Sequence, residues 1–91
     1  MVKYNEFGEF IKQRRLELGF SLRRFCLAYS MCSAHMSKME RGLIKPYINN
    51  KPIKKLAEAL EIEPGTELHE KMRKAWEASM RIQVPEYFLS A

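Results

Sequence analysis

The sequence predicts an all-α fold. Apolar residues recur at three- and four-residue steps in successive segments, which is the spacing of a helix with one buried face. Glycine and proline separate these segments, at Gly19, at Gly42 and at Pro64-Gly65. The 91 residues, of which 46% are hydrophobic, suffice for one modest core. We therefore expect a single domain of five helices over residues 1–81, followed by an apolar tail over residues 82–91.

The first predicted helix runs from Tyr4 to Leu18, and Gly19 ends it because glycine tolerates the left-handed conformation that follows many helices. Ser21 can cap a second helix by accepting a hydrogen bond from a backbone N–H one turn on. The apolar positions of the two helices are Phe7, Phe10, Ile11, Leu18, Leu22, Phe25, Cys26 and Tyr29.

A short turn at Ser30 precedes the third predicted helix, which ends at Gly42. Ser33 is the better cap chemically, although the spacing favours Cys32 as the residue that begins this helix. Met36 and Met39 are expected to face the core, since they lie three positions apart. The outward positions are then Ser33, Ala34, Ser37 and Lys38. Three of these side chains are small, so the helix can approach the floor of a groove closely.

A connector over residues 43–51 leads to the fourth predicted helix, in which Pro52 takes the first position because its missing N–H is not needed there. Ile53, Leu56, Ala57 and Leu60 form its apolar face. Thr66 caps the fifth helix. The sequence leaves Trp76 open, as a core residue or as a contact with a second copy of the chain.

Several apolar residues near the C-terminus are candidates for a contact with another chain. An apolar segment such as residues 82–91 is rarely left in water, so it packs back on the domain or packs on a partner. The candidate contact residues are Trp76, Met80, Tyr87, Phe88 and Leu89.

Positive charge is concentrated in the N-terminal half. Residues 1–45 carry nine Lys or Arg against four Glu, whereas residues 46–91 carry seven of each sign. The entire net charge of +5 therefore lies with the first three predicted helices. Such an uneven surplus suits contact with phosphates, although a solvated basic face is the simpler alternative.

The residue types argue against several other classes of function. No acid pair, nucleophile with a base, metal-ligand cluster or phosphate-binding glycine loop is recognisable, so neither an enzyme nor a bound metal or cofactor is expected. Cys26 and Cys32 are too few for a disulfide framework, and we expect both as thiols. No apolar run of membrane-spanning length and no leader is apparent, so a cytoplasmic protein without membrane contact is expected.

The stretch Ser21 to Gly42, SLRRFCLAYSMCSAHMSKMERG, together with Phe7-Gly8, Arg15 and Pro46, resembles the Xre/Cro-type helix-turn-helix family of phage repressors. The segment Ser37-Lys38-Met39-Glu40-Arg41-Gly42 is its most specific part, and the likeness resumes over residues 56–60. The resemblance implies a helix-turn-helix over residues 21–42 in a repressor-like domain, with a bacterial or phage origin.

The resemblance also implies a role for particular residues. Base-reading roles fall on Ser33, Ala34, Ser37 and Lys38, with Lys38 suited to guanine O6 and N7. Phosphate-binding roles fall on Ser21, Leu22, Arg41 and Lys45. Arg23 and Arg24 are unusual cations at a helix start, where a phosphate facing them would remove the conflict with the helix dipole, although simple solvation is the alternative. The family often has glutamine where this chain has Leu22, which removes one expected side-chain contact. Arg15 and Glu40 match positions that form an ion pair between the first and third helices.

Two functions follow as hypotheses. The first is a transcriptional regulator, expected to be a repressor, that reads an inverted repeat in double-stranded DNA as a homodimer. The alternative is an antitoxin that binds a protein toxin, through the tail, and represses its own operon.

Overall fold

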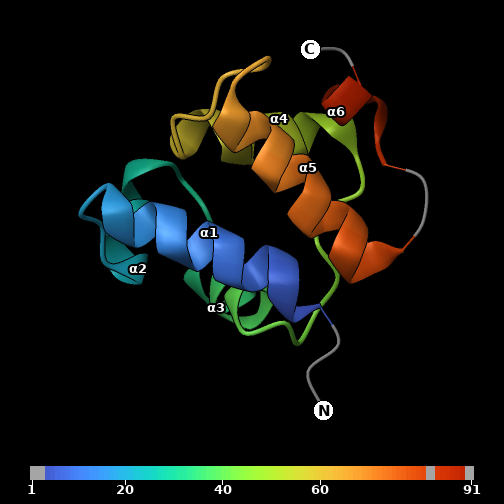
Figure 1. Cartoon of the computed structure of the whole chain (residues 1–91). Helices are drawn as coiled ribbons and strands as arrows, with labels where there is room; N and C mark the ends of the chain where they lie inside the picture. The colour runs from blue at the N-terminus through green and yellow to red at the C-terminus, as the bar shows by residue number, and fades with distance from the viewer. Residues whose placement is uncertain (1–3, 82–83, 90–91) are drawn as a thin grey trace.

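The computed structural model describes residues 4–81 and 84–89 (Figure 1). The regular structure of these residues consists of six helices. They are α1 (Asn5–Glu17), α2 (Leu22–Ala28), α3 (Ser33–Glu40), α4 (Asn50–Ala59), α5 (Glu67–Met80) and α6 (Glu86–Leu89). No strand occurs in these residues, so the predicted all-α class is confirmed. None of the helices in this part of the chain is long and apolar enough to cross a membrane.

The helix boundaries follow the predicted signals at most ends. Ser21 Oγ accepts a hydrogen bond from the Arg24 N–H at 3.2 Å, and Thr66 Oγ1 accepts one from the His69 N–H at 3.2 Å. Gly19 and Gly42 follow α1 and α3 with φ of 84° and 75°. The predicted caps and C-terminal glycines are therefore present.

Two predictions about the helices were wrong. The helix predicted to begin at Pro52 begins at Asn50, which makes the proline its third residue. A proline is tolerated there because the N–H groups of the whole first turn lack partners within the helix. The count of five helices was also wrong, because Glu86–Leu89 of the expected tail forms α6.

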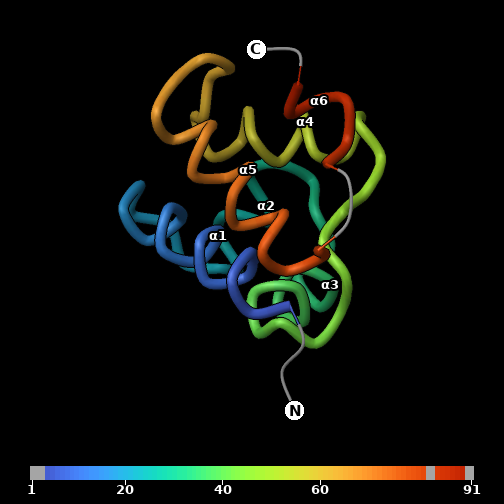
Figure 2. The backbone as a smooth tube through the Cα atoms, turned by 45° about the vertical axis from the view of Figure 1, so that its right-hand side comes forward, coloured from blue at the N-terminus to red at the C-terminus, as the bar shows by residue number. Residues whose placement is uncertain are grey.

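All six helices contribute side chains to one core, and α1 and α5 lie side by side in both backbone views (Figures 1 and 2). Its largest fully buried side chains come from five helices: Phe7, Ile11, Phe25, Met36, Met39, Ile53, Leu56, Met72 and Trp76. Trp76 is 1% exposed, and its indole Nε1 donates to the Tyr47 carbonyl at 2.8 Å. Of the two alternatives left open by the sequence, the core position is the one observed.

Polar side chains form hydrogen bonds between helix ends and residues far away in the sequence. Ser79 Oγ, on α5, accepts from the Phe7 N–H in the first turn of α1 at 2.8 Å. Arg14 Nε donates to the Leu60 carbonyl at the end of α4 at 2.9 Å. Because the ends of a helix leave backbone groups without partners in the helix, each contact satisfies one such group and orients two helices.

α6 folds back on the domain. The Tyr87 N–H donates to Asn50 Oδ1 at 2.8 Å, which joins α6 to the start of α4. The rings of Tyr87 and Phe88 lie 5.3 and 5.9 Å from that of His69, and Phe88 also contacts Trp76. The predicted contact residues Trp76, Tyr87 and Phe88 are therefore buried within the chain, whereas Leu89 is 60% exposed and Met80 is half-buried.

Gly8 allows α1 to cross the end of α3 at close range. A Cβ atom added there would clash with the carbonyl oxygen of Met39 and would lie 2.5 Å from that of Glu40. Backbone atoms cannot yield as the end of a flexible side chain can, so the two helices would have to separate.

We predict that Gly8→Ala lowers the free energy of unfolding by about 1–3 kcal/mol, as in other overpacked cores, measured by urea denaturation. Helix propensity alone predicts the opposite sign, a gain of about 0.5–1 kcal/mol. Gln13→Ala, at an exposed position of the same helix, should stay within about 0.5 kcal/mol of the wild type. A stabilised Gly8→Ala variant would show that the two helices are not in close contact.

His69 is a buried titratable residue. Its ring is 2% exposed and its Nε2 has no hydrogen-bond partner among the described residues. Burial lowers the His69 pKa below its ordinary value of 6.5, with Glu70 opposing the shift and Arg73 adding to it. Below pH 6.5 the unfolded chain therefore takes up this proton more readily than the folded chain, and the stability decreases as the pH falls toward the lowered pKa.

We predict that the melting temperature of the wild type falls between pH 8 and pH 5 by more than that of His69→Phe, measured by circular dichroism. Phenylalanine keeps an aromatic ring against Tyr87 and Phe88 but does not titrate. His35→Ala, which changes an exposed histidine, should keep the wild-type acid response. Equal slopes for the wild type and His69→Phe would rule out this origin of the acid sensitivity.

Candidate nucleic-acid interface

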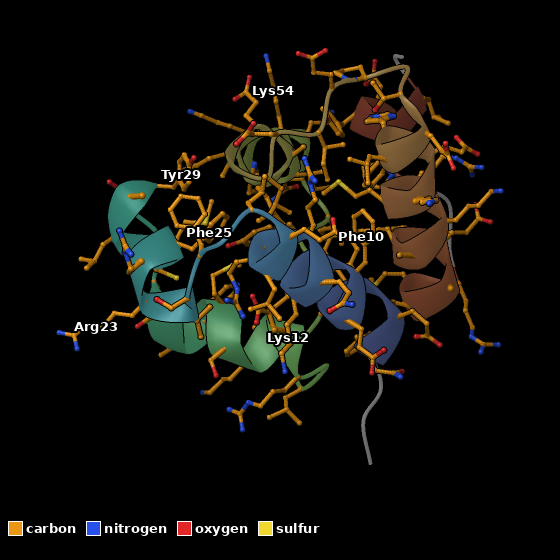
Figure 3. The ribbon with its side chains drawn as sticks, turned by 60° about the vertical axis from the view of Figure 1, so that its left-hand side comes forward. Phe10, Lys12, Arg23, Phe25, Tyr29 and Lys54 are labelled. Atoms are coloured by element: carbon orange, nitrogen blue, oxygen red, sulfur yellow. The ribbon has the colours of Figure 1, made fainter. Side chains whose placement is uncertain are left out.

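α2 and α3 form two short helices joined by a tight turn. The turn places Ser30 at φ 54°, in the left-handed region, and its carbonyl accepts a hydrogen bond from Lys55 Nζ at 3.4 Å. The Phe25 ring packs against those of Phe20 and Tyr29, with centroids 5.8 and 5.1 Å apart, and Figure 3 shows Phe25 and Tyr29 at this end of α2. These contacts fix α2 relative to the turn that leads into α3.

The inner face of α3 is fixed by the core. Met36 and Met39 are buried, as their spacing predicted, and Cys32 rather than Ser33 is the residue that precedes the first turn. The side chain of Cys32 makes no capping hydrogen bond, so the chemically better cap is not used.

The outer face of α3 carries the four predicted base-reading residues. Ser33, Ala34 and Lys38 are exposed and Ser37 is half-buried. His35 is exposed as well, and its ring stacks on that of Tyr47 with centroids 5.4 Å apart and planes 14° apart. This stacking holds His35 against the connector that follows α3, so it is not free to extend from the helix.

The ion pair expected between Arg15 and Glu40 is present and buried. Arg15 Nε and Nη2 donate to the two carboxylate oxygens of Glu40 at 2.8 and 2.9 Å, and Nη1 donates to the Phe20 carbonyl at 2.7 Å. Arg15 is 4% and Glu40 7% exposed. The hydrogen bond to Glu40 raises the pKa of Arg15, so the cation is favoured despite burial. The pair joins α1 to the last residue of α3.

Most of the predicted phosphate-binding residues are exposed around α3. Arg23, Arg24, Arg41 and Lys45 are exposed, and Arg41 Nε donates to the Ser37 carbonyl at 3.4 Å. Ser21 is exposed and engaged as the cap of α2, whereas Leu22 is half-buried and packs on the core. Four exposed cations therefore lie on α2 and on the segment that follows α3, the two parts of the chain that adjoin α3.

Sequence reasoning missed one cation of this region. Lys12 of α1 lines a groove of about 510 Å³ together with Leu22, Ser37 and Arg41, and Arg15 and Glu40 also line it. In Figure 3, Lys12 and Arg23 project on the side of the molecule where α3 lies. The signal in the sequence was weak, because a lysine on the polar side of an amphipathic helix is usually just solvated.

The described residues contain no group of three or more His, Cys, Asp or Glu side chains able to hold a metal ion. Cys26 is buried and Cys32 is exposed, and both are thiols. Burial raises the pKa of the Cys26 thiol.

Comparison with known proteins finds no family model, curated protein or solved structure that matches this chain significantly. The resemblance to the Xre/Cro family therefore stays a prediction.

We predict that Arg15→Met lowers the free energy of unfolding by about 3–5 kcal/mol in urea denaturation, because it leaves the Glu40 carboxylate buried without its partner. The double variant Arg15→Met/Glu40→Met should recover a large part of this loss, since it removes both charges and fills their space. Additive losses in the double variant would contradict this explanation.

Proposed function

We propose that this chain is a sequence-specific DNA-binding regulator in which α2 and α3 act as a helix-turn-helix and α3 enters the major groove. The observation that carries the proposal is the outer face of α3. Small side chains at Ser33 and Ala34 lie beside one long cation, Lys38, on a helix whose angle is held by the Arg15–Glu40 pair. Small side chains permit close approach to base edges, and a lysine can donate to guanine.

The charges around α3 support the same proposal. Arg23 and Arg24 precede α3 in the chain and Arg41 and Lys45 follow it, and all four are exposed. Exposed cations on the segments that adjoin a reading helix attract the phosphates that border a groove and fix the register of the protein on the duplex.

The proposed regulator binds an inverted repeat as a homodimer and acts as a repressor. One domain of this size buries little DNA surface, so two copies are needed for tight and specific binding. The two α3 helices would then read half-sites about 34 Å apart.

The antitoxin alternative is not carried further. The tail was its candidate toxin-binding segment, and in that segment Val84 is buried while Tyr87 and Phe88 are buried in α6, which packs on α4 and α5. Leu89 alone of the predicted tail contacts is well exposed.

We predict that the purified protein enriches an inverted repeat from a random duplex pool at about 0.15 M salt, where distant surface charges are already screened. Lys38→Ala should relax the preference at one base pair of each half-site, at a cost of about 1–3 kcal/mol in discrimination. Lys74→Ala, an exposed lysine of α5, should leave both the affinity and the preferred sequence unchanged.

Each other outcome of the selection has a definite meaning. Binding without enrichment would refute sequence-specific reading, and no binding at all would refute the function as a whole. An unchanged preference in Lys38→Ala would refute only the contact assigned to that side chain.

A further inference from the structure

The groove between α1 and α3 is lined by two cations from separate elements. Lys12 belongs to α1, and Arg41 directly follows α3. Neither forms an ion pair within the described residues, although a neighbouring glutamate, Glu9, also lines the groove. Arg15 and Glu40, which lie in the same groove, already satisfy each other's charge. Two cations, Lys12 and Arg41, and one carboxylate, Glu9, are thus the charges left to act on a ligand, and their sum is positive.

The position of the groove indicates which ligand reaches it. Ser37 lines the groove and also belongs to the outer face of α3 that we assign to base reading. A duplex contacted by that face brings its sugar–phosphate backbone past the mouth of the groove. Leu22 also lines the groove, and its apolar side chain supplies no competing polar partner.

We propose that this groove receives one phosphate of the DNA backbone, held by Lys12 and Arg41. The inference rests on the proposed DNA-binding function and adds to it a contact from α1. It places one phosphate between the first and third helices, where Lys12 adds a cation from α1 to the one supplied by Arg41. Two cations on one phosphate position the duplex without reading its sequence.

The test compares Lys12→Ala with Lys74→Ala on the duplex recovered by selection. Lys12 makes no hydrogen bond or ion pair within the described residues, so its removal should leave the fold intact, as checked by thermal melting. We expect Lys12→Ala to bind more weakly at every salt concentration while keeping the same base preference. Its slope of log affinity against log salt should be shallower by about 1 per contact, or about 2 for a homodimer. Lys12→Arg should restore most of the wild-type binding.

Single neutral methylphosphonates in the duplex then locate the contact. One position in each half-site should weaken the wild type by more than it weakens Lys12→Ala, in which Arg41 still contacts that phosphate. Equal binding and equal slopes for Lys12→Ala and Lys74→Ala would overturn this inference while leaving the proposed function intact. Failure of the wild type to bind any duplex would overturn both. Lys12-dependent binding of inorganic phosphate, with no methylphosphonate effect, would reassign the groove to a free anion and overturn the DNA contact.

Discussion

The buried ion pair between Arg15 and Glu40 determines how α3 is presented to solvent. Two charges in a protein interior are costly unless every hydrogen-bonding group is used, and here both carboxylate oxygens and three guanidinium nitrogens have partners. Its third bond, to the Phe20 carbonyl, extends the connection to the segment between α1 and α2. Such a pair contributes less to net stability than to orientation, because well-packed apolar side chains would stabilise a core as well.

The other long-range polar contacts follow from the small size of the domain. Ninety-one residues bury a limited apolar area, so helix ends cannot be left without hydrogen-bond partners at low cost. Ser79 completes the first turn of α1, and Arg14 binds the end of α4. The indole N–H of Trp76 donates a hydrogen bond to the Tyr47 carbonyl, so this buried side chain of α5 holds the connector that follows α3. The stacked ring of Tyr47 transmits this constraint to His35 on α3.

Local signals in the sequence predicted much of this structure. Serine and threonine caps, glycines after helices and the spacing of Met36 and Met39 depend on neighbours within one helical turn, so they could be recognised in the chain. The role of Ser79, the acceptor of Arg14 and the burial of His69 depend on residues far away in the sequence, and no local pattern reveals them. Lys12 was missed for the same reason, since only the packing of α1 on α3 brings it beside Arg41. The Arg15–Glu40 pair is also long-range, and it was predicted only through the family resemblance.

Positioning and reading are closely coupled in the proposed complex. The outer face of α3 offers few groups for base edges, since Ala34 has no hydrogen-bonding side chain and His35 is held against Tyr47. Short side chains such as Ser33 and Ser37 contact a base only when the helix backbone lies deep in the groove. In the proposed complex this depth would be set by the phosphate contacts of the cations near α3 and by the angle that the buried ion pair imposes. After a small outward displacement of α3, Lys38 would be the one side chain of this face long enough to reach a base. Base discrimination by this surface therefore depends on cations that never contact a base.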